Sequence, residues 1–346
     1  MNTLLGDSMI MARSLSRLIL FIVSSLALTA CNEVPLSYGD ANSIIAVMST
    51  ETWAEVQDDV YRALEPTVTT VRAEKTFTVT YQEPGAAYWE NLRRFRQMVV
   101  VGSRDDYWVQ EVLEDAREPI TENGIHQVYD VWSRGQTITL ILMDQEWDRA
   151  DLLPYLPRVN ELLDGQFRKY AQNRMYMSGI DSALADTLSL RAGFSMMLPM
   201  VYRWQTRDSV YIFRNDNPDP SELIRQIGLT WITPASDDLG QDRVVAWRNE
   251  MAEAHYTEPQ LVVIEGLVER LVHLNGIPSY EFQSQWRNPP DRGWPAGGPL
   301  ITRVVTCDSQ DRTYLLDAWL YAPGKEKYEY MIQLETILDS FRCGSA

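Results

Sequence analysis

Residues 268–286 read VERLVHLNGIPSYEFQSQW and place Asn275-Gly276 between two runs rich in apolar residues. An Asn-Gly pair is a preferred centre for a two-residue hairpin, because both residues tolerate positive φ. The stretch therefore predicts two antiparallel strands, at 268–274 and 277–286, joined by a tight turn. This hairpin indicates that the second half of the chain contains an antiparallel sheet.

The segments around the hairpin extend this prediction. Downstream, we expect strands at 300–306 and 313–321 and a closing helix at 326–341. Upstream, the pattern predicts strands at 194–205 and 209–214, a short helix capped by Ser221, and a helix at 241–254. We therefore assign residues 179–346 to one α+β domain with helices packed on its sheet.

The first half mixes strands and helices without strict alternation. Residues 43–48 form a compact apolar strand, and Thr50 or Thr52 is suited to cap the helix that follows it. A hairpin is expected at 127–143 and a long amphipathic helix at 151–177. The chain of 346 residues suits two domains, and residues 42–178 form the first, an α+β domain with a mixed or largely antiparallel sheet.

The N-terminus has the pattern of a bacterial lipoprotein signal. Arg13 and Arg17 precede an apolar run at 18–28 that spans only about 16 Å as a helix, too short to cross a bilayer. The run ends in Leu28-Thr29-Ala30-Cys31, which resembles a lipobox. The sequence thus predicts a signal peptide at 1–30, with Met1 or Met11 as its start, and a lipidated Cys31.

We expect residues 31–41 to act as a tether between the acyl chains and the first domain. A formal net charge of −17 predicts that the body is repelled by anionic headgroups and by nucleic acid. The expected location is the cell envelope, outside the cytoplasm, with the periplasmic face of the outer membrane favoured over the inner membrane. The alternative is a plain signal peptide with an incidental cysteine.

Two cysteines remain when Cys31 carries lipid, in a compartment that permits disulfides. Cys307 ends an expected strand and Cys343 follows the closing helix. A bond between them would close a loop of about 36 residues and contribute about 3–4 kcal/mol. The alternative is a pair of free thiols too far apart to react.

Several short segments resemble one known family. They are residues 43–48 (SIIAVM), 297–299 (GGP), 321–331 (YAPGKEKYEYM) and 333–335 (QLE). The chain resembles the uncharacterised bacterial lipoprotein family catalogued as domain of unknown function 4837, over most of its mature length and most specifically towards the C-terminus. More loosely, the second half is similar to PsbP-type α/β/α sandwiches, a resemblance that implies a binding or assembly module.

Catalytic and metal-binding motifs are absent from the sequence. It has no HExxH, CxxC, GxSxG, GxxxxGK[ST] or GxGxxG pattern, and its three histidines are far apart. Acidic pairs such as Asp58-Asp59 and Asp105-Asp106 are typical of solvated surface. We therefore expect no cofactor, no metal and no catalytic residues.

The segment 286–299 is the candidate for partner binding. It carries Trp286, Arg287, Arg292 and Trp294 in a stretch too rich in Gly and Pro for regular structure. Tryptophan and arginine dominate the energetics of interfaces, so such a loop is typical of a binding edge. The alternative is a loop whose tryptophans only cover the core.

Together these patterns predict a membrane-anchored envelope lipoprotein that binds a protein or an envelope polymer and is not an enzyme. The alternative is an envelope hydrolase that uses dispersed carboxylates. That alternative predicts a deep polar pocket with a carboxylate of strongly raised pKa.

Overall fold

The computed structural model describes residues 34–236 and 239–344, and the predicted signal peptide and Cys31 lie outside these residues. The first half consists of β1 (Ser43–Val47), α2 (Thr50–Leu64), β2 (Thr67–Thr69), β3 (Ala73–Lys75), β4 (Thr78–Gln82), α3 (Trp89–Leu92), β5 (Gln97–Ser103), α4 (Tyr107–Glu114), β6 (Gly124–Tyr129), β7 (Thr137–Met143), α5 (Arg149–Leu152) and α6 (Tyr155–Met175). The second half continues with η1 (Tyr176–Ser178), α7 (Ser182–Ala192), β8 (Phe194–Ser195), β9 (Arg203–Arg207), β10 (Val210–Asn215), β11 (Ile224–Ile232), α8 (Gln241–His255), β12 (Leu261–Leu274), β13 (Ile277–Arg287), β14 (Gly297–Cys307), η2 (Asp308–Gln310), β15 (Arg312–Tyr321), α9 (Tyr328–Asp339) and β16 (Arg342–Cys343).

The first half is a five-stranded mixed sheet between helices. Its strand order is β4-β1-β5-β7-β6, and every neighbouring pair is parallel except β6 with β7. Apolar side chains of α2 and α6 pack on one face and those of α4 on the other. The expectation of a largely antiparallel sheet is therefore wrong, whereas a mixed sheet is confirmed. Strands covered by helices on both faces read as continuous apolar runs, and β5 is buried along its whole length.

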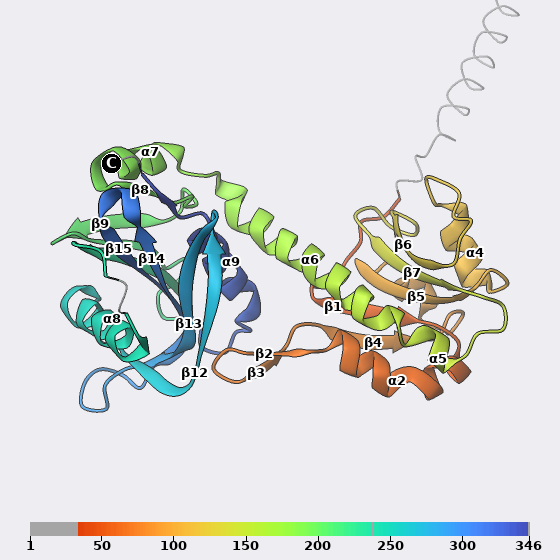
Figure 1. The fold of residues 1–346 in the computed structure, drawn as a ribbon. Coiled ribbons are helices and arrows are strands. Elements are labelled where there is room, and N and C mark those ends of the chain that lie inside the picture. Colours follow the sequence, from red (N-terminus) through yellow and green to blue (C-terminus); the bar gives the residue numbers. More distant parts are fainter. Residues whose placement is uncertain (1–33, 237–238, 345–346) are drawn as a thin grey trace, which may run out of the picture.

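The second half is an α/β/α sandwich, as predicted. Its seven-stranded sheet has the order β12-β13-β14-β15-β11-β10-β9 and is antiparallel throughout. Helix α8 covers one face, and α7 and α9 pack on the other (Figure 1). The predicted hairpin is present, with Leu274 paired to Ile277 and with φ of 50° at Asn275 and 87° at Gly276.

Two predictions for this half are wrong. The expected strand at 194–205 is only the two-residue β8, followed by an irregular segment and β9. Ser221 does not cap a helix, because its backbone N–H and hydroxyl both donate to Asp219 in a turn that leads into β11. Strand β11 lies inside the sheet and is buried on both faces along most of its length, so it lacks the alternation that identifies a half-buried strand.

Helix α6 connects the two halves (Figure 1). Its N-terminal part packs on α2, and it also packs along α9 of the second half. The predicted helix at 151–177 is thus divided into α5 and α6 near Pro154, which cannot donate a backbone hydrogen bond. Ile332 of α9 is buried in the apolar core of the first half, so this core extends across the connection.

The predicted tether is, from Pro35 onwards, attached to the first half. Arg134 N–H donates to the carbonyl of Pro35 at 2.8 Å, and Ser37 N–H donates to the carbonyl of Arg134 at 2.9 Å. Arg96 N–H donates to the carbonyl of Tyr38 at 2.7 Å. These bonds hold the segment as part of the folded body rather than as a free spacer. Within the described residues, every helix is too short or too polar to cross a membrane.

The Cys307–Cys343 disulfide is present, with the two Cα atoms 5.9 Å apart. It joins the end of β14 to β16, which pairs with β8. The bond therefore fastens the C-terminal segment to the sheet beside α7, as the sequence predicted.

Candidate functional site

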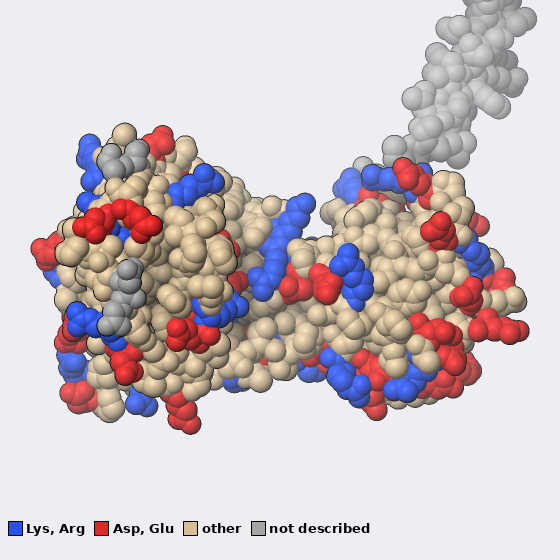
Figure 2. Space-filling view, viewed as in Figure 1, with Lys and Arg blue, Asp and Glu red and all other residues tan. Residues whose placement is uncertain are grey.

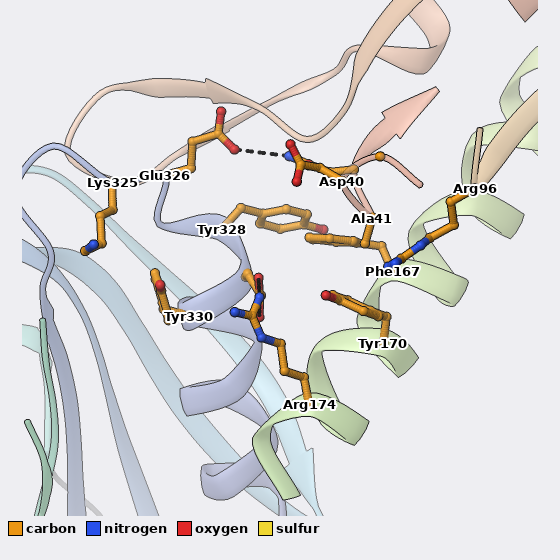
Figure 3. Close-up of a pocket in the computed structure, with 13 residues that line it drawn as sticks. Asp40, Ala41, Arg96, Phe167, Tyr170, Arg174, Lys325, Glu326, Tyr328 and Tyr330 are labelled. Atoms are coloured by element: carbon orange, nitrogen blue, oxygen red, sulfur yellow. Dashed lines mark hydrogen bonds and ion pairs between the residues drawn. The ribbon is translucent and has the colours of Figure 1, made fainter. Parts of the chain in front are cut away.

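A cavity of about 450 Å³ lies where the two halves meet, and we call it the central cleft (Figure 3). Its walls are the segment before β1, Arg96 beside β5, the C-terminal part of α6, and residues 325–330 at the start of α9. From α6, Phe167, Tyr170 and Arg174 follow a spacing of three and four residues, which places them on one face of a helix.

Three aromatic rings form a row along the central cleft. The ring of Phe167 lies 5.8 Å from that of Tyr328 and 6.2 Å from that of Tyr170, with interplanar angles of 21° and 20°. Phe167 is buried, whereas Tyr170 and Tyr328 are half-buried. The guanidinium of Arg96 lies over the Tyr170 ring, 5.8 Å from its centroid. The cleft thus offers ring faces next to a cation, from both halves of the chain.

Arg96 differs from the neighbouring cations of the cleft in its pairing. Arg174 Nη1 contacts both carboxylate oxygens of Glu329, at 3.2 and 3.0 Å, and Lys325 lies 3.3 Å from Glu222. Within the described part of the chain, Arg96 forms no ion pair with an acidic side chain. In the part of the chain that the structure describes, its guanidinium lies over the Tyr170 ring without a carboxylate partner, so it is available to an anionic group.

The carboxylates of the central cleft have distinct surroundings. Burial raises the pKa of Glu329 above its usual value, while Arg174 opposes this shift and Gln333 Nε2 donates to Glu329 at 3.1 Å. Glu326 accepts a hydrogen bond from Asn42 Nδ2 at 3.1 Å, a contact between the two halves. The cleft is consequently polar and mixed in charge.

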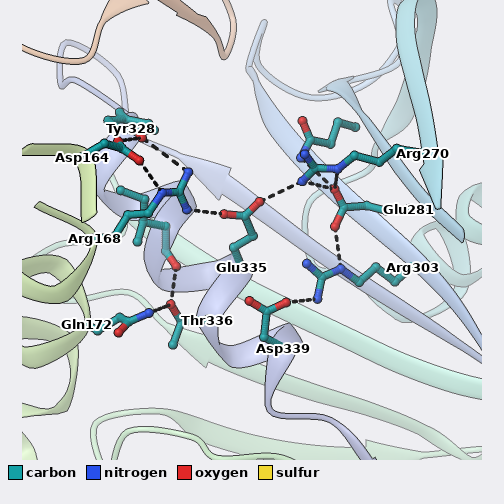
Figure 4. A network of polar contacts seen from close by, with 12 residues as sticks. Asp164, Arg168, Gln172, Arg270, Glu281, Arg303, Tyr328, Glu335, Thr336 and Asp339 are labelled. Atoms are coloured by element: carbon teal, nitrogen blue, oxygen red, sulfur yellow. Dashed lines mark hydrogen bonds and ion pairs between the residues drawn. The ribbon is translucent and has the colours of Figure 1, made fainter. Parts of the chain in front are cut away.

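A chain of ion pairs continues from the cleft into the second half (Figure 4). Arg168 on α6 contacts Asp164 at 2.9 Å and Glu335 of α9 at 3.0 Å. Glu335 contacts Arg270 of β12 at 3.0 Å, and Arg270 contacts Glu281 of β13 at 2.6 Å. Each charged group in this row of ion pairs has a partner of opposite charge. We therefore infer that the row of ion pairs holds α6 against the second half.

The last links of this network are buried in the sheet. Glu281 is 0% exposed, and its carboxylate accepts from Arg303 Nε at 2.6 Å, where Arg303 is 2% exposed. Arg303 also donates to Asp339 of α9 at 2.7 Å. A buried ion pair of this kind depends on both partners, because either charge alone would be strongly destabilised.

The structure separates the residues of the predicted binding loop. Trp286 belongs to β13, is 2% exposed, and donates its indole N–H to the carbonyl of Leu320 at 3.0 Å. Its inclusion in a partner-binding loop is therefore corrected: it is a core residue, because the strand continues to Arg287. The loop itself is shorter than expected, since β14 already begins at Gly297.

The other three residues of that prediction are accessible. Arg287 is exposed, Trp294 is 84% exposed, and Arg292 forms a surface ion pair with Glu253 at 2.7 Å. Because Arg292 is paired with Glu253, the exposed indole of Trp294 is the side chain of this loop that we expect to contact a partner. Binding by Arg287, Arg292 and Trp294 stays a prediction.

The acidic pairs singled out in the sequence have structural contacts. Hydrogen bonds from Arg149 and Arg62, both at 2.7 Å, hold the pKa of Asp59 below its usual value. Asp106 accepts from the backbone N–H of Ser103 at 2.7 Å. Asp59 is buried, so its expected place on a solvated surface is wrong.

The central cleft itself was not identified from the sequence. Arg96 belongs to none of the predicted motifs, and Tyr328, Glu329 and Tyr330 enter only through the segment 321–331 of the family resemblance. The helical spacing of Phe167, Tyr170 and Arg174 was a detectable signal. These segments lie together only because α6 packs against α9, and this packing is not visible in the sequence pattern.

The comparisons with known proteins agree with the resemblance stated from the sequence. The family model described as Domain of unknown function (DUF4837) matches residues 181–340, so the family is found in the second half and the expected extent over most of the mature length is wrong. A second model, Domain of unknown function (DUF8532), matches residues 37–153. No curated protein matches the chain.

Solved structures are similar to part of the chain. One is cyanobacterial PsbP (CyanoP) from Synechocystis sp. PCC 6803, at 13% identity and a TM-score of 0.30, covering 44% of this chain and 86% of that chain. Another is the Ran-binding protein Mog1p of Saccharomyces cerevisiae, at 11% identity and a TM-score of 0.29. The match covers 44% of this chain and 91% of that chain. This similarity carries no function to the present chain.

Proposed function

We propose that the protein is a lipid-anchored binding module of the bacterial cell envelope, which holds an acidic glycan segment of an envelope polymer in the central cleft. The observation that carries the proposal is the pairing of Arg96 with an aromatic ring rather than with an acid, on the wall of a cavity of about 450 Å³. A guanidinium in this position suits a carboxylate or phosphate group.

The remaining walls of the cleft support a sugar as the neighbour of that anionic group. The C–H faces of sugar rings are apolar and pack on aromatic rings such as Tyr170 and Tyr328, while hydroxyl groups need the polar partners that Asn42 and Asp40 supply. The opening of the cleft between two halves suits a segment of a longer polymer. Anchoring through Cys31 rests on the lipobox pattern, with the periplasmic face of the outer membrane as the proposed location.

Calorimetric titration tests the binding step. We expect soluble fragments of the muramic-acid-containing cell-wall glycan to bind more tightly than uncharged chito-oligosaccharides of equal length. Arg96→Gln should weaken binding of the acidic fragments about tenfold or more, since a charge-assisted hydrogen bond contributes roughly 1.5–3 kcal/mol. Arg158→Gln, which changes an arginine on α6 that is 65% exposed, is the matched control.

Two results would overturn this assignment. One is equal affinity of the acidic and uncharged fragments, and the other is equal binding by the Arg96 and Arg158 variants. If cross-linking in cells instead captures one stoichiometric protein that is lost in Arg96→Gln, the cleft binds a protein segment and not a glycan. Acylation is tested separately by incorporation of labelled palmitate, which should be absent in Cys31→Ala.

An envelope hydrolase is the second candidate, and the raised pKa of Glu329 is the observation that favours it. A hydrolase requires that Glu329→Gln abolish turnover of cell-wall fragments while binding remains. If the protein is a binding module, neither the native protein nor the Glu329→Gln variant turns over these fragments. Because Glu329 is paired with Arg174 at 3.0 Å, we rank catalysis below binding.

A further inference from the structure

Exposed apolar side chains gather in one part of the second half. We name them the methionine patch, and it consists of Met177, Ile180, Leu190, Met197, Met200 and Val201. Met177 is 84% exposed, Leu190 86% and Met200 62%. A contiguous group of large exposed apolar residues is unusual on a protein surface in water and marks an interaction site for a protein, a membrane or a ligand.

Backbone contacts join the segment at 176–181 to the segment at 197–201, which together carry five of these residues, and Leu190 lies further along the chain on α7. Met200 N–H donates to the carbonyl of Gly179 at 3.0 Å, and Asp181 N–H donates to the carbonyl of Leu198 at 2.9 Å. Tyr176 also donates its hydroxyl to the carbonyl of Met197 at 3.0 Å. The segment that follows η1 therefore lies directly beside the segment that follows β8.

The methionine patch adjoins a further cavity of about 400 Å³. Met175, Met177, Pro199, Val201, Pro218 and Leu223 contribute apolar walls to this cavity. Methionine side chains are flexible and adapt to irregular apolar surroundings. The surface is thus both apolar and deformable.

The patch lies on the same side of the molecule as the start of the described chain. In Figure 1, α7 occupies the upper rim of the second half, and the chain enters the first half from the same upper side. At that entry Val34 is 52% exposed and Leu36 63% exposed. The elements that lead into these two apolar regions therefore lie on the same side of the molecule in Figure 1.

The distance from the proposed anchor is short. Cys31 precedes Val34 by three residues, which span at most about 10 Å when fully extended. If Cys31 is acylated, this rim of the first half must lie close to the bilayer. Helix α2 lies on the lower side in Figure 1, where Asp and Glu side chains gather in Figure 2 with some Lys and Arg among them.

We propose that the methionine patch contacts the lipid surface to which the acylated Cys31 is anchored, so that the protein meets the membrane at both halves. The anchoring part of this inference rests on the proposed function. Zwitterionic headgroups fit this surface best, because Asp186 lies one helical turn before Leu190 and the net charge of the chain is −17. Exposed Arg191 has a long aliphatic stem that reaches along such a surface to the headgroups.

The test uses the acylated full chain in phosphatidylcholine vesicles that contain a lipid-borne quencher. A fluorophore is attached to Met177→Cys or, as a matched control, to Trp294→Cys. Both positions are 84% exposed, and the loop that carries Trp294 follows the end of β13 opposite the Asn275-Gly276 hairpin, at the lower rim in Figure 1. We expect at least threefold stronger quenching at position 177 than at position 294.

Equal quenching at the two positions would overturn the proposal. A second experiment keeps the inference separate from acylation: the full chain with Cys31→Ala is floated with the same vesicles. We expect weak flotation that is lost when Met177, Leu190 and Met200 are all changed to Gln. No flotation of the parent, or flotation unchanged by the triple substitution, would refute the lipid contact whether or not Cys31 is acylated.

A second copy of the chain is the competing occupant of this surface. Sedimentation of the Cys31→Ala chain without vesicles distinguishes it, and we expect a monomer. A dimer that dissociates in the triple variant would replace the lipid contact with self-association.

Discussion

Glu281→Gln is expected to lower the free energy of unfolding of the second half by about 3 kcal/mol. In the native protein the Glu281 carboxylate is fully buried and accepts from Arg303 Nε at 2.6 Å, from Arg270 Nε at 2.6 Å and from Gln283 Nε2 at 2.8 Å. The amide of glutamine keeps the shape of the side chain, yet it removes the charge and directs N–H groups towards the donors around it.

The magnitude follows from what remains for the buried cation. Removing one partner of a buried ion pair costs roughly 3–5 kcal/mol. Arg303 keeps a contact with Asp339 at 2.7 Å, and Asp339 is 62% exposed, so we take the lower end of that range. Arg270→Gln is the matched control, because Arg270 is 47% exposed and its loss should cost about 1 kcal/mol or less.

Urea unfolding, followed by far-ultraviolet circular dichroism, measures both variants against the native protein. A loss below about 1 kcal/mol for Glu281→Gln, or equal losses for the two variants, would refute the reasoning. A third variant, Glu281→Leu with Arg303→Met, removes both charges together. We expect it to regain most of the lost stability, because no buried charge is left without a partner.

Three further predictions concern stability. Cys343→Ser should lower the free energy of unfolding by about 4 kcal/mol, because the bond to Cys307 closes a loop with a sequence separation of 36, and calorimetry under non-reducing conditions measures the loss. Asp59→Asn should flatten the acid-induced loss of stability, because the two arginines lower the pKa of the Asp59 carboxyl in the folded state. The native carboxylate therefore stabilises the fold above its ordinary pKa of 3.8 and loses that effect as the pH falls below this value, which a urea series between pH 6 and pH 3 detects. Gly228→Ala should cost roughly 1–3 kcal/mol, since a Cβ in β11 would overlap the Tyr256 hydroxyl, and thermal unfolding against the native chain tests this.

The sequence-based predictions of the fold succeeded where local chemistry decides the structure. The Asn275-Gly276 turn needs positive φ at both residues, and the structure has it. The closing helix, expected at 326–341, is observed as Tyr328–Asp339. The pairing of Cys307 with Cys343 followed from their places beside a strand and a helix.

Two of the failures share one physical cause. Strand β11 lies in the interior of the sheet and is buried along most of its length, so it lacks the alternation of a half-buried strand. The same burial explains Trp286, which looked like a loop residue because Pro and Gly follow closely. Whether such residues are buried depends on which elements cover them.

The amino-acid sequence by itself determined the two α+β halves, the hairpin, the disulfide and the absence of known catalytic motifs, because turn chemistry, periodicity and spacing act over short segments of chain. Only the tertiary structure decided the central cleft, where Arg96, Tyr170 and Tyr328 meet from distant parts of the chain. It also decided which charges are paired, including the buried contact of Glu281 with Arg303. The physical reason is that packing of α6 against α9 brings these groups together, and long-range packing leaves no signature in the spacing of neighbouring residues.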